Sequence, residues 1–179
     1  GQTIAIDGIA NARTSALGTY TGFSVQNQPV GANVFPTPTT ISLGAGHSVP
    51  LGTIDNDAKA MVAALNNAGI AGLTAKADAT QVGSVATDTT GVTAGATTLT
   101  LNNVAITVQV TGNATANRAN ALAAINAQSA VTGVVATDDG KGLKLSAADG
   151  RNINTELDPA ATNATMAAFG LGPAGTTRS

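Results

Sequence analysis

Residues 98–110 decide the fold, and they read Thr98-Leu99-Thr100-Leu101-Asn102-Asn103-Val104-Ala105-Ile106-Thr107-Val108-Gln109-Val110. Polar and apolar residues alternate on both sides of the asparagine pair, and this period of two is typical of half-buried strands. Adjacent asparagines tolerate the positive φ angles of a tight turn. The stretch predicts a β-hairpin whose candidate core residues are Leu99, Leu101, Val104, Ile106, Val108 and Val110.

A helix and a second hairpin are predicted to follow. Residues 115–128 form an alanine-padded segment in which Leu122 and Ile125 lie three positions apart on one face, and Thr115 or Asn117 can cap its first turn. The Asp-Gly turn of the next hairpin is a strong short-range signal. This hairpin comprises Val131, Val134 and Ala136, the turn Asp138-Asp139-Gly140, and then Leu143, Leu145 and Ala147.

The same hairpin, helix and hairpin pattern occurs earlier in the chain in a weaker form. Residues 39–43 correspond to residues 97–101, and the offset of later matches drifts only to about 61 positions. Further matched pairs are Leu65 with Ile125, Asn66 with Asn126, Gly72 with Gly133, Leu73 with Val134, and Ala75 with Ala136. We expect the first copy to be less regular, because Pro50 weakens its second strand and residues 81–86 make a poor closing strand.

These patterns predict an α+β fold with two hairpin–helix–hairpin (ββαββ-like) modules and antiparallel sheets. The first, degenerate module covers residues 39–95 and the second covers residues 96–157. Residues 1–38 are expected to form an irregular N-terminal β or linker segment. Residues 158–179 are expected to return along the molecule without adding a core element beyond one short helical turn, and to end in a mobile tail.

Composition excludes several classes of function. The net charge is −2 with only 8 basic residues among 179, too few for the basic stripe that nucleic acid or an anionic membrane surface requires. No run of about 18 apolar residues occurs, so no membrane-spanning segment is predicted. Cys is absent, which excludes disulfides, thiolate metal sites and a thiol nucleophile. We therefore expect no nucleic-acid or membrane partner.

Several short patterns have a possible chemical reading and a simpler structural one. Residues 170–175 fit G-x-G-x-x-G by letters, but no helix or acidic residue follows, which favours a flexible tail over a dinucleotide site. The lone His47 favours a solvated turn, because metal and general-base sites need clustered partners. Asp55 and Asp57 suit the N-terminus of a helix.

Two more patterns have simpler readings. Asp138 and Asp139 suit a hairpin turn better than a cation loop, since the other oxygen ligands are absent. Two sequons, at Asn113 and Asn163, arise readily by chance in a chain rich in Asn and Thr. With few ionisable groups and no G-x-S-x-G elbow, we expect no catalytic, cofactor-binding or metal-binding residue, no cofactor and no enzyme activity.

The second module resembles the flagellin IN motif of the variable central region of bacterial flagellins. The resemblance covers about residues 97–157 and rests on features that occur in order: Ile125-Asn126, the strand after Gly133, Leu143-x-Leu145, and Asp149-Gly150-Arg151-x-Ile153. The first module has Leu65-Asn66 and lacks the Asp-Gly-Arg close. Residues 1–4, Gly-Gln-Thr-Ile, also resemble the point where flagellins leave their rod domain.

The resemblance implies a structural function. It suggests the outward-facing variable domain of a flagellin subunit, extracellular on the bacterial flagellum after flagellar export, lacking the polymerising terminal helices. Its implied partners are other flagellin subunits, through those absent rod domains, and host antibodies, and the fragment is expected to be monomeric. Two alternatives remain: a module of a flagellar cap or hook-associated protein, and a secreted glycan-binding or host-binding adhesin module. The scarcity of aromatic residues disfavours the adhesin.

Overall fold

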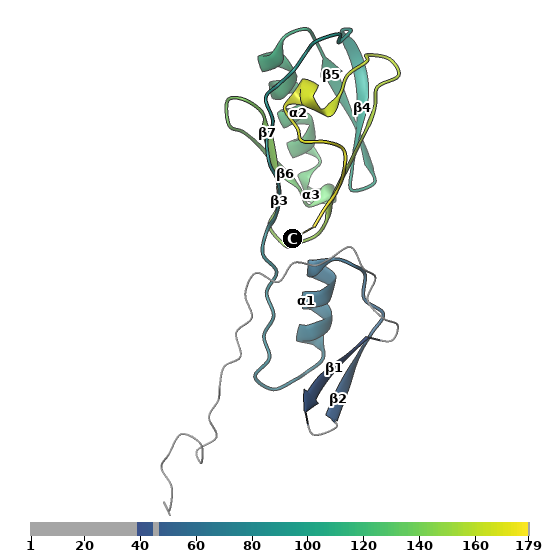
Figure 1. Ribbon diagram of the computed structural model, residues 1–179, viewed down its shortest axis with the longest axis vertical. Coiled ribbons are helices and arrows are strands. Elements are labelled where there is room, and N and C mark those ends of the chain that lie inside the picture. The colour runs from purple at the N-terminus through teal and green to yellow at the C-terminus, as the bar shows by residue number, and fades with distance from the viewer. Residues whose placement is uncertain (1–38, 45–46, 179) are drawn as a thin grey trace, which may run out of the picture.

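The computed structural model describes residues 39–44 and 47–178, and it confirms the α+β class (Figure 1). The N-terminal segment expected over residues 1–38 lies outside the described residues. The strands are β1 (Thr39–Gly44), β2 (His47–Gly52), β3 (Thr80–Val82), β4 (Gly95–Leu101), β5 (Val104–Val110), β6 (Val135–Asp138), β7 (Leu143–Ala147), β8 (Ile153–Asp158) and β9 (Gly175–Thr177). The helices are α1 (Ala58–Asn67), α2 (Ala114–Ala127), α3 (Ser129–Thr132) and the 3₁₀ helix η1 (Met166–Phe169).

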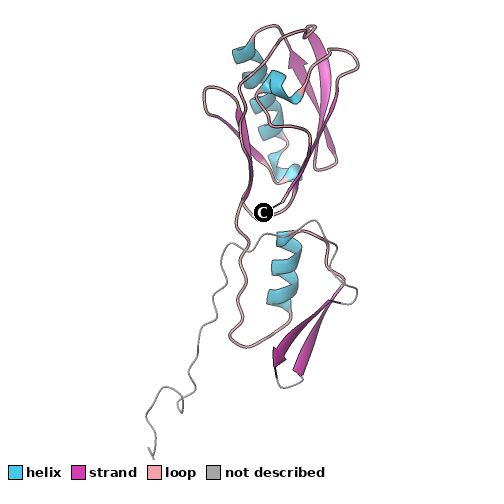
Figure 2. Ribbon diagram, viewed as in Figure 1, coloured by secondary structure: helices cyan, strands magenta, loops and turns pink. Residues whose placement is uncertain are grey.

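The described strands form three antiparallel sheets, with the orders β1-β2, β3-β7-β6 and β5-β4-β8-β9. Helix α2 contacts β5 of the four-stranded sheet and β6 of the three-stranded sheet, and Figure 2 shows it between the two. We call residues 39–78 the first unit and residues 80–178 the second unit. The main hydrophobic core lies in the second unit, where both sheets cover α2.

The hairpin predicted over residues 98–110 is confirmed as β4 and β5. Asn102 and Asn103 have φ angles of 47° and 64°, and Leu101 pairs with Val104 directly across the turn. The predicted inward face is buried at Leu99, Leu101, Ile106, Val108 and Val110, whereas Val104 beside the turn is half-buried.

The predicted helix forms as α2, but its cap is a different residue. The side chain of Asn113 accepts a hydrogen bond from the Ala116 N–H at 2.9 Å, so the expectation of a cap at Thr115 or Asn117 was wrong. Asn117 is fully buried instead, and it accepts from the Thr111 N–H at 2.7 Å and donates to the Thr111 carbonyl at 2.9 Å. This side chain therefore fastens the helix to the end of β5.

Of the residues predicted for the second hairpin, Val134 is buried just before β6 begins, and Val131 does not join the hairpin either. It lies in α3 with 66% of its surface exposed, because the chain makes one more helical turn before Gly133 takes a φ of 70°. The rest of the prediction is confirmed, with β6 and β7 paired in antiparallel register and Leu143, Leu145 and Ala147 buried.

The internal repeat is visible in matching hydrogen bonds. Asn126 receives the Ala136 N–H at 2.8 Å and donates to the Ala136 carbonyl at 3.1 Å. Asn66 makes the same pair of bonds to Ala75, at 2.8 and 2.9 Å. Gly72 and Gly133, which were matched by sequence, both have left-handed φ angles of 78° and 70°. The two copies thus share the path from helix to following extended segment.

The second hairpin expected in the first module does not form. The only strand that follows α1 before residue 95 is β3, and it pairs with β7 of the second unit, with Thr80 opposite Ala147. Residues 74–82 contain no Gly, Pro or Asn, whereas the second unit turns at Gly140 with a φ of 91°. Asp78 is the only residue of this stretch that favours a turn, and Figure 1 shows the chain running from the first unit directly into β3.

The short helical turn expected in the C-terminal segment is present as η1, and the residues after this turn also join the core, contrary to the sequence expectation. Phe169 is fully buried and is the largest side chain of this kind, and Met166 and Leu171 are buried beside it. Met166 and Phe169 share one side of η1, because a 3₁₀ helix has three residues per turn. A helix of four residues is too short to show an apolar periodicity in the sequence. Strand β9 then pairs with β8, and mobility of the tail stays a prediction.

We expect Ile125→Ala to lower the free energy of unfolding by about 2–5 kcal/mol, because this fully buried side chain leaves a cavity between α2 and the sheets. Urea unfolding followed by circular dichroism measures the loss. Leu122→Ala is the control on the same helix, and its half-buried side chain predicts a smaller loss. Equal losses for the two variants would mean that Ile125 does not occupy the core.

Candidate functional site

A cluster of polar side chains lies where the two units meet. Asp57 caps α1 through one carboxylate oxygen, which accepts the Ala60 N–H at 3.2 Å. Its other oxygen accepts the Asn152 N–H of the second unit at 2.7 Å, and the Asn152 side chain donates to the Asn56 carbonyl at 2.7 Å. The helix-terminal role predicted for Asp57 is confirmed. The same carboxylate also joins the two units, which the sequence did not indicate.

Arg151 and Asp149 form the charged part of this cluster. The Arg151 guanidinium donates from Nε and Nη2 to the Asp149 carboxylate at 2.8–3.1 Å, and from Nη1 to the Thr132 carbonyl at 3.0 Å. It lies directly against Gly133, where an added Cβ would come within 2.1 Å of the Arg151 Cζ. Gly133 thus leaves the space that the guanidinium occupies.

Asp149 also binds a lysine of the first unit. The Lys59 Nζ lies 2.8 Å from the Asp149 Oδ2. Hydrogen bonds from Arg151 and then from Lys59 outweigh partial burial and hold the pKa of Asp149 well below its usual range, while Asp149 raises the pKa of Arg151. Asp149 therefore stays ionised at ordinary pH, which suits a structural anchor better than a general acid.

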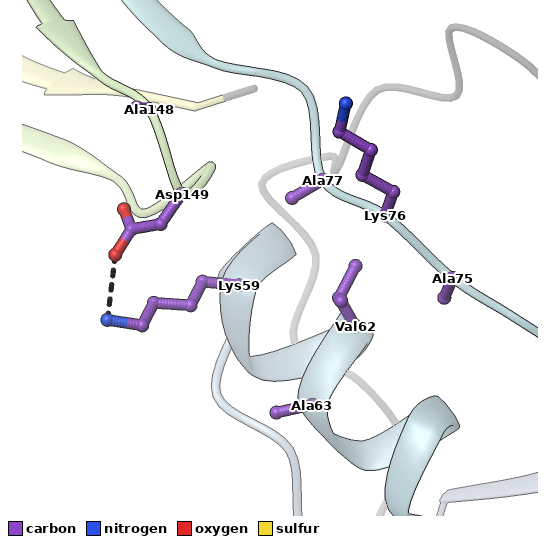
Figure 3. A pocket seen from close by; sticks show the side chains of 8 residues that line it. All are labelled: Lys59, Val62, Ala63, Ala75, Lys76, Ala77, Ala148 and Asp149. Atoms are coloured by element: carbon purple, nitrogen blue, oxygen red, sulfur yellow. Dashed lines mark ion pairs between the residues drawn. The ribbon is translucent and has the colours of Figure 1, made fainter.

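A shallow groove of about 360 Å³ adjoins this cluster (Figure 3). Lys59, Val62 and Ala63 of α1 form one wall, residues 75–77 form the other, and the turn at Asp149 closes one end. The walls are mainly apolar, and its one carboxylate already has two cationic partners. The groove offers apolar contact and lysine ammonium groups, a combination suited to binding rather than to proton transfer.

The G-x-G-x-x-G letters mark a crossing of three backbone segments. The Gly170 carbonyl accepts the N–H groups of Val85 and Leu143, both at 3.0 Å. A Cβ on Gly142 would lie 2.1 Å from the Val85 oxygen, and one on Gly170 would lie 2.3 Å from the Gly142 Cα. Residues 170–175 follow η1 and lead into β9, so the strand before and helix after that a dinucleotide site requires are not formed.

Asp138 and Asp139 are used within the fold, in the hairpin turn predicted for them. Asp138 accepts from the Nε of nearly buried Arg118 at 3.1–3.2 Å, which links α2 to the turn. Asp139 accepts from Ser84 and from the N–H groups of Lys141 and Gly142, and the Ser84 hydrogen bond is the main cause that lowers the pKa of Asp139 to about 2. Sequence reasoning did not single out Arg118, although a lone cation in an alanine-rich helix facing an acidic turn was a usable signal.

The other candidate residues stay separate from this cluster. His47 is exposed at the start of β2, and Asp55 is exposed before α1. The side-chain oxygen of Asn113 caps α2, and Asn163 is exposed with a φ of 51°. Within residues 39–44 and 47–178, no three His, Asp or Glu side chains are grouped closely enough to hold a metal ion. No helix in the described part of the chain is long and apolar enough to cross a membrane.

No protein-family model matches this chain, and a search of the curated proteins finds no match.

We expect Gly142→Ala to lower the free energy of unfolding by at least about 2–3 kcal/mol, because its Cβ would meet two backbone carbonyl oxygens that cannot move independently. Gly112→Ala is the matched control, since no atom outside its chain neighbours lies within 4 Å of the added Cβ. Thermal unfolding of both variants measures the difference. Two equally stable proteins would show that the crossing is loosely packed.

Asp149→Asn is expected to destabilise the protein at pH 7 and to matter less at pH 3. The folded pKa is depressed, so the stabilising contribution is complete above the unfolded pKa of about 3.9 and is lost as the pH falls towards the folded pKa. Urea midpoints at the two pH values test this. Asp55→Asn removes an exposed carboxylate that takes part in none of the described ion pairs, and an equal loss in that variant would attribute the effect to net charge.

Proposed function

We propose that this chain is a structural protein, the outward-facing variable domain of a flagellin subunit in a bacterial flagellar filament. The observation that carries the proposal is that the residues on which the flagellin IN resemblance rests have architectural roles. Most of these side chains hold elements together, and Asp149, which also lines the groove, has its carboxylate bound by Arg151 and Lys59. A motif of this kind preserves a shape.

Each part of the motif has its own structural contact. Ile125 fills the core, and Asn126 holds the extended segment that follows the helix through both backbone groups of Ala136. Gly150 has a φ of 73° and packs so closely that a Cβ would lie 2.3 Å from the Ala77 Cβ. Arg151 bridges Asp149 and the Thr132 carbonyl, and Ile153 is fully buried at the start of β8.

The surface of the second unit is suited to a filament in which many copies of the chain lie close together. The face of the four-stranded sheet away from α2 presents hydroxyl groups, including the cross-strand pair Thr98 and Thr107 and the exposed Thr176. Charged residues make up only 10% of the chain. Copies arranged closely along a filament would therefore accumulate little electrostatic repulsion. This location is extracellular, with other flagellin subunits contacted through terminal rod regions and host antibodies contacting the exposed domain.

Immunogold electron microscopy tests the proposal. Antibodies raised against the purified chain are applied to intact cells of the organism that encodes it, and we expect gold along the whole length of the flagellar filaments. Antibody pre-absorbed with the chain is the control, and peptide mass spectrometry of sheared filaments should identify the same sequence.

The other labelling patterns would each contradict the flagellin assignment. Gold only at filament tips or at the hook junction would support a cap or hook-associated protein. Gold on the cell body with bare filaments would support an adhesin module.

A further inference from the structure

The first unit has an extended segment after α1, and one side of its backbone has no partner among the described residues. The backbone N–H and C=O of Ala75 bond to Asn66, as described above. In an extended segment the neighbouring residues direct their backbone groups to the opposite side. Those of Thr74 and Lys76 form no hydrogen bond with any described residue, and both residues are exposed. We call residues 74–77 the open edge.

The second unit shows what covers the equivalent edge. Its extended segment is β6, and the residues on either side of Ala136, Val135 and Thr137, lie opposite Ser146 and Lys144 of β7. Strand β7 brings Leu143 and Leu145 into the core, where both are buried. The internal repeat therefore defines the missing element of the first unit as an antiparallel strand with apolar side chains at alternate positions.

The matched residues of the two units also differ in exposure, and those of the first unit are less buried. Ile125 and Val134 are fully buried in the second unit, whereas their counterparts Leu65 and Leu73 are only half-buried. The described first unit has a two-stranded sheet, and its buried hydrophobic residues are Ile54 and Ala58. An isolated two-stranded sheet is at best marginally stable in water, so this unit depends on the packing of its hairpin against α1. Another strand would add the apolar area that this unit lacks.

The open edge adjoins the groove of Figure 3. Residues 75–77 line the groove opposite Val62 and Ala63, so apolar side chains and unpaired backbone groups occur together. Lys76 at its rim has no ion-pair partner among the described residues. A peptide segment that carries an acidic residue beside its apolar positions would therefore bind more favourably, because its carboxylate can pair with the Lys76 ammonium group.

We propose that the first unit binds an extended peptide segment of a partner protein by β-strand addition along residues 74–77. The segment has apolar side chains at alternate positions, as in β7, and an acidic residue that meets Lys76. Main-chain hydrogen bonds to Thr74 and Lys76 supply affinity, and the groove selects the side chains. The proposal concerns binding alone and does not depend on the flagellin assignment, which the immunogold experiment tests separately.

The probe is a peptide copy of residues 142–149 with Lys144 changed to glutamate, Gly-Leu-Glu-Leu-Ser-Ala-Ala-Asp, because β7 places Lys144 opposite Thr137, the counterpart of Lys76. It is titrated into the ¹⁵N-labelled full chain, and amide resonances and hydrogen exchange are followed by NMR. We expect shifts confined to residues 59–77 and slowed exchange of the Thr74 and Lys76 amides. The same peptide with both leucines changed to serine should bind at least about tenfold more weakly, because it lacks the apolar positions.

Two variants of the protein locate the site. Lys76→Pro removes the edge N–H and should weaken binding at least about tenfold, whereas Lys76→Ala keeps that N–H and should bind within about threefold of the unchanged chain. Val62→Ser alters the groove wall without touching the backbone, and it should also weaken binding, which keeps the test valid if the proline variant unfolds.

Several results would overturn the proposal. One is the absence of shifts at 1 mM peptide. Another is equal binding by the Lys76→Pro and Val62→Ser variants and the unchanged chain. Shifts at β3 or β6 in place of the open edge would assign binding to the second unit. Protection of the Thr74 and Lys76 amides before any peptide is added would show that the chain already covers this edge.

Discussion

The pairing of β3 with β7 is the constraint on which the rest of the structure depends. It takes the strand that follows the first helical repeat and adds it to the sheet of the second, with Thr80 opposite Ala147 and Val82 opposite Leu145. The second unit thereby gains a three-stranded sheet against α2, and Val82 packs on the core. The first unit keeps only the β1-β2 hairpin and α1. Because a backbone edge can bind only one partner, β3 cannot pair with β7 and also pair within the first unit. Its pairing with β7 therefore accounts for both the well-buried core of the second unit and the open edge of the first.

The covalent continuity of residues 74–82 brings the two units close, and a small set of polar contacts holds them there. Asp57 accepts from Asn152 while it caps α1, and Asp149 binds both Arg151 and Lys59. The amide oxygens of Asn56 and Asn152 are buried without a donor in the described part of the chain, which costs free energy. The junction is therefore specific in geometry and modest in stability, as expected where a few charged groups replace an apolar interface.

The sequence predicted the elements whose signals are local. The hairpin of β4 and β5 followed from alternation around Asn102-Asn103, and the β6-β7 hairpin followed from Asp139-Gly140. The repeat alignment was accurate enough to match Asn66 with Asn126, and both side chains make the same pair of backbone bonds. The sequence did not identify Asn113 as the cap of α2, because four polar residues near the start of this helix can each serve as a cap. They are Thr111, Asn113, Thr115 and Asn117. The groove was not predicted, since its walls come from three distant segments.

What the sequence by itself determined is therefore the secondary structure and the repeat, because turn residues and apolar periodicity act within a few positions along the chain. Tertiary structure alone decided where each element packs. Met166 and Phe169 reach the core because η1 places them on one side, and Gly142 and Gly170 matter because three backbone segments that are distant in sequence cross there. The destination of β3 was likewise undetermined locally. A strand of three residues such as β3 has too short a pattern to specify its partner. It paired with the free edge of β7, which lies beside the larger core.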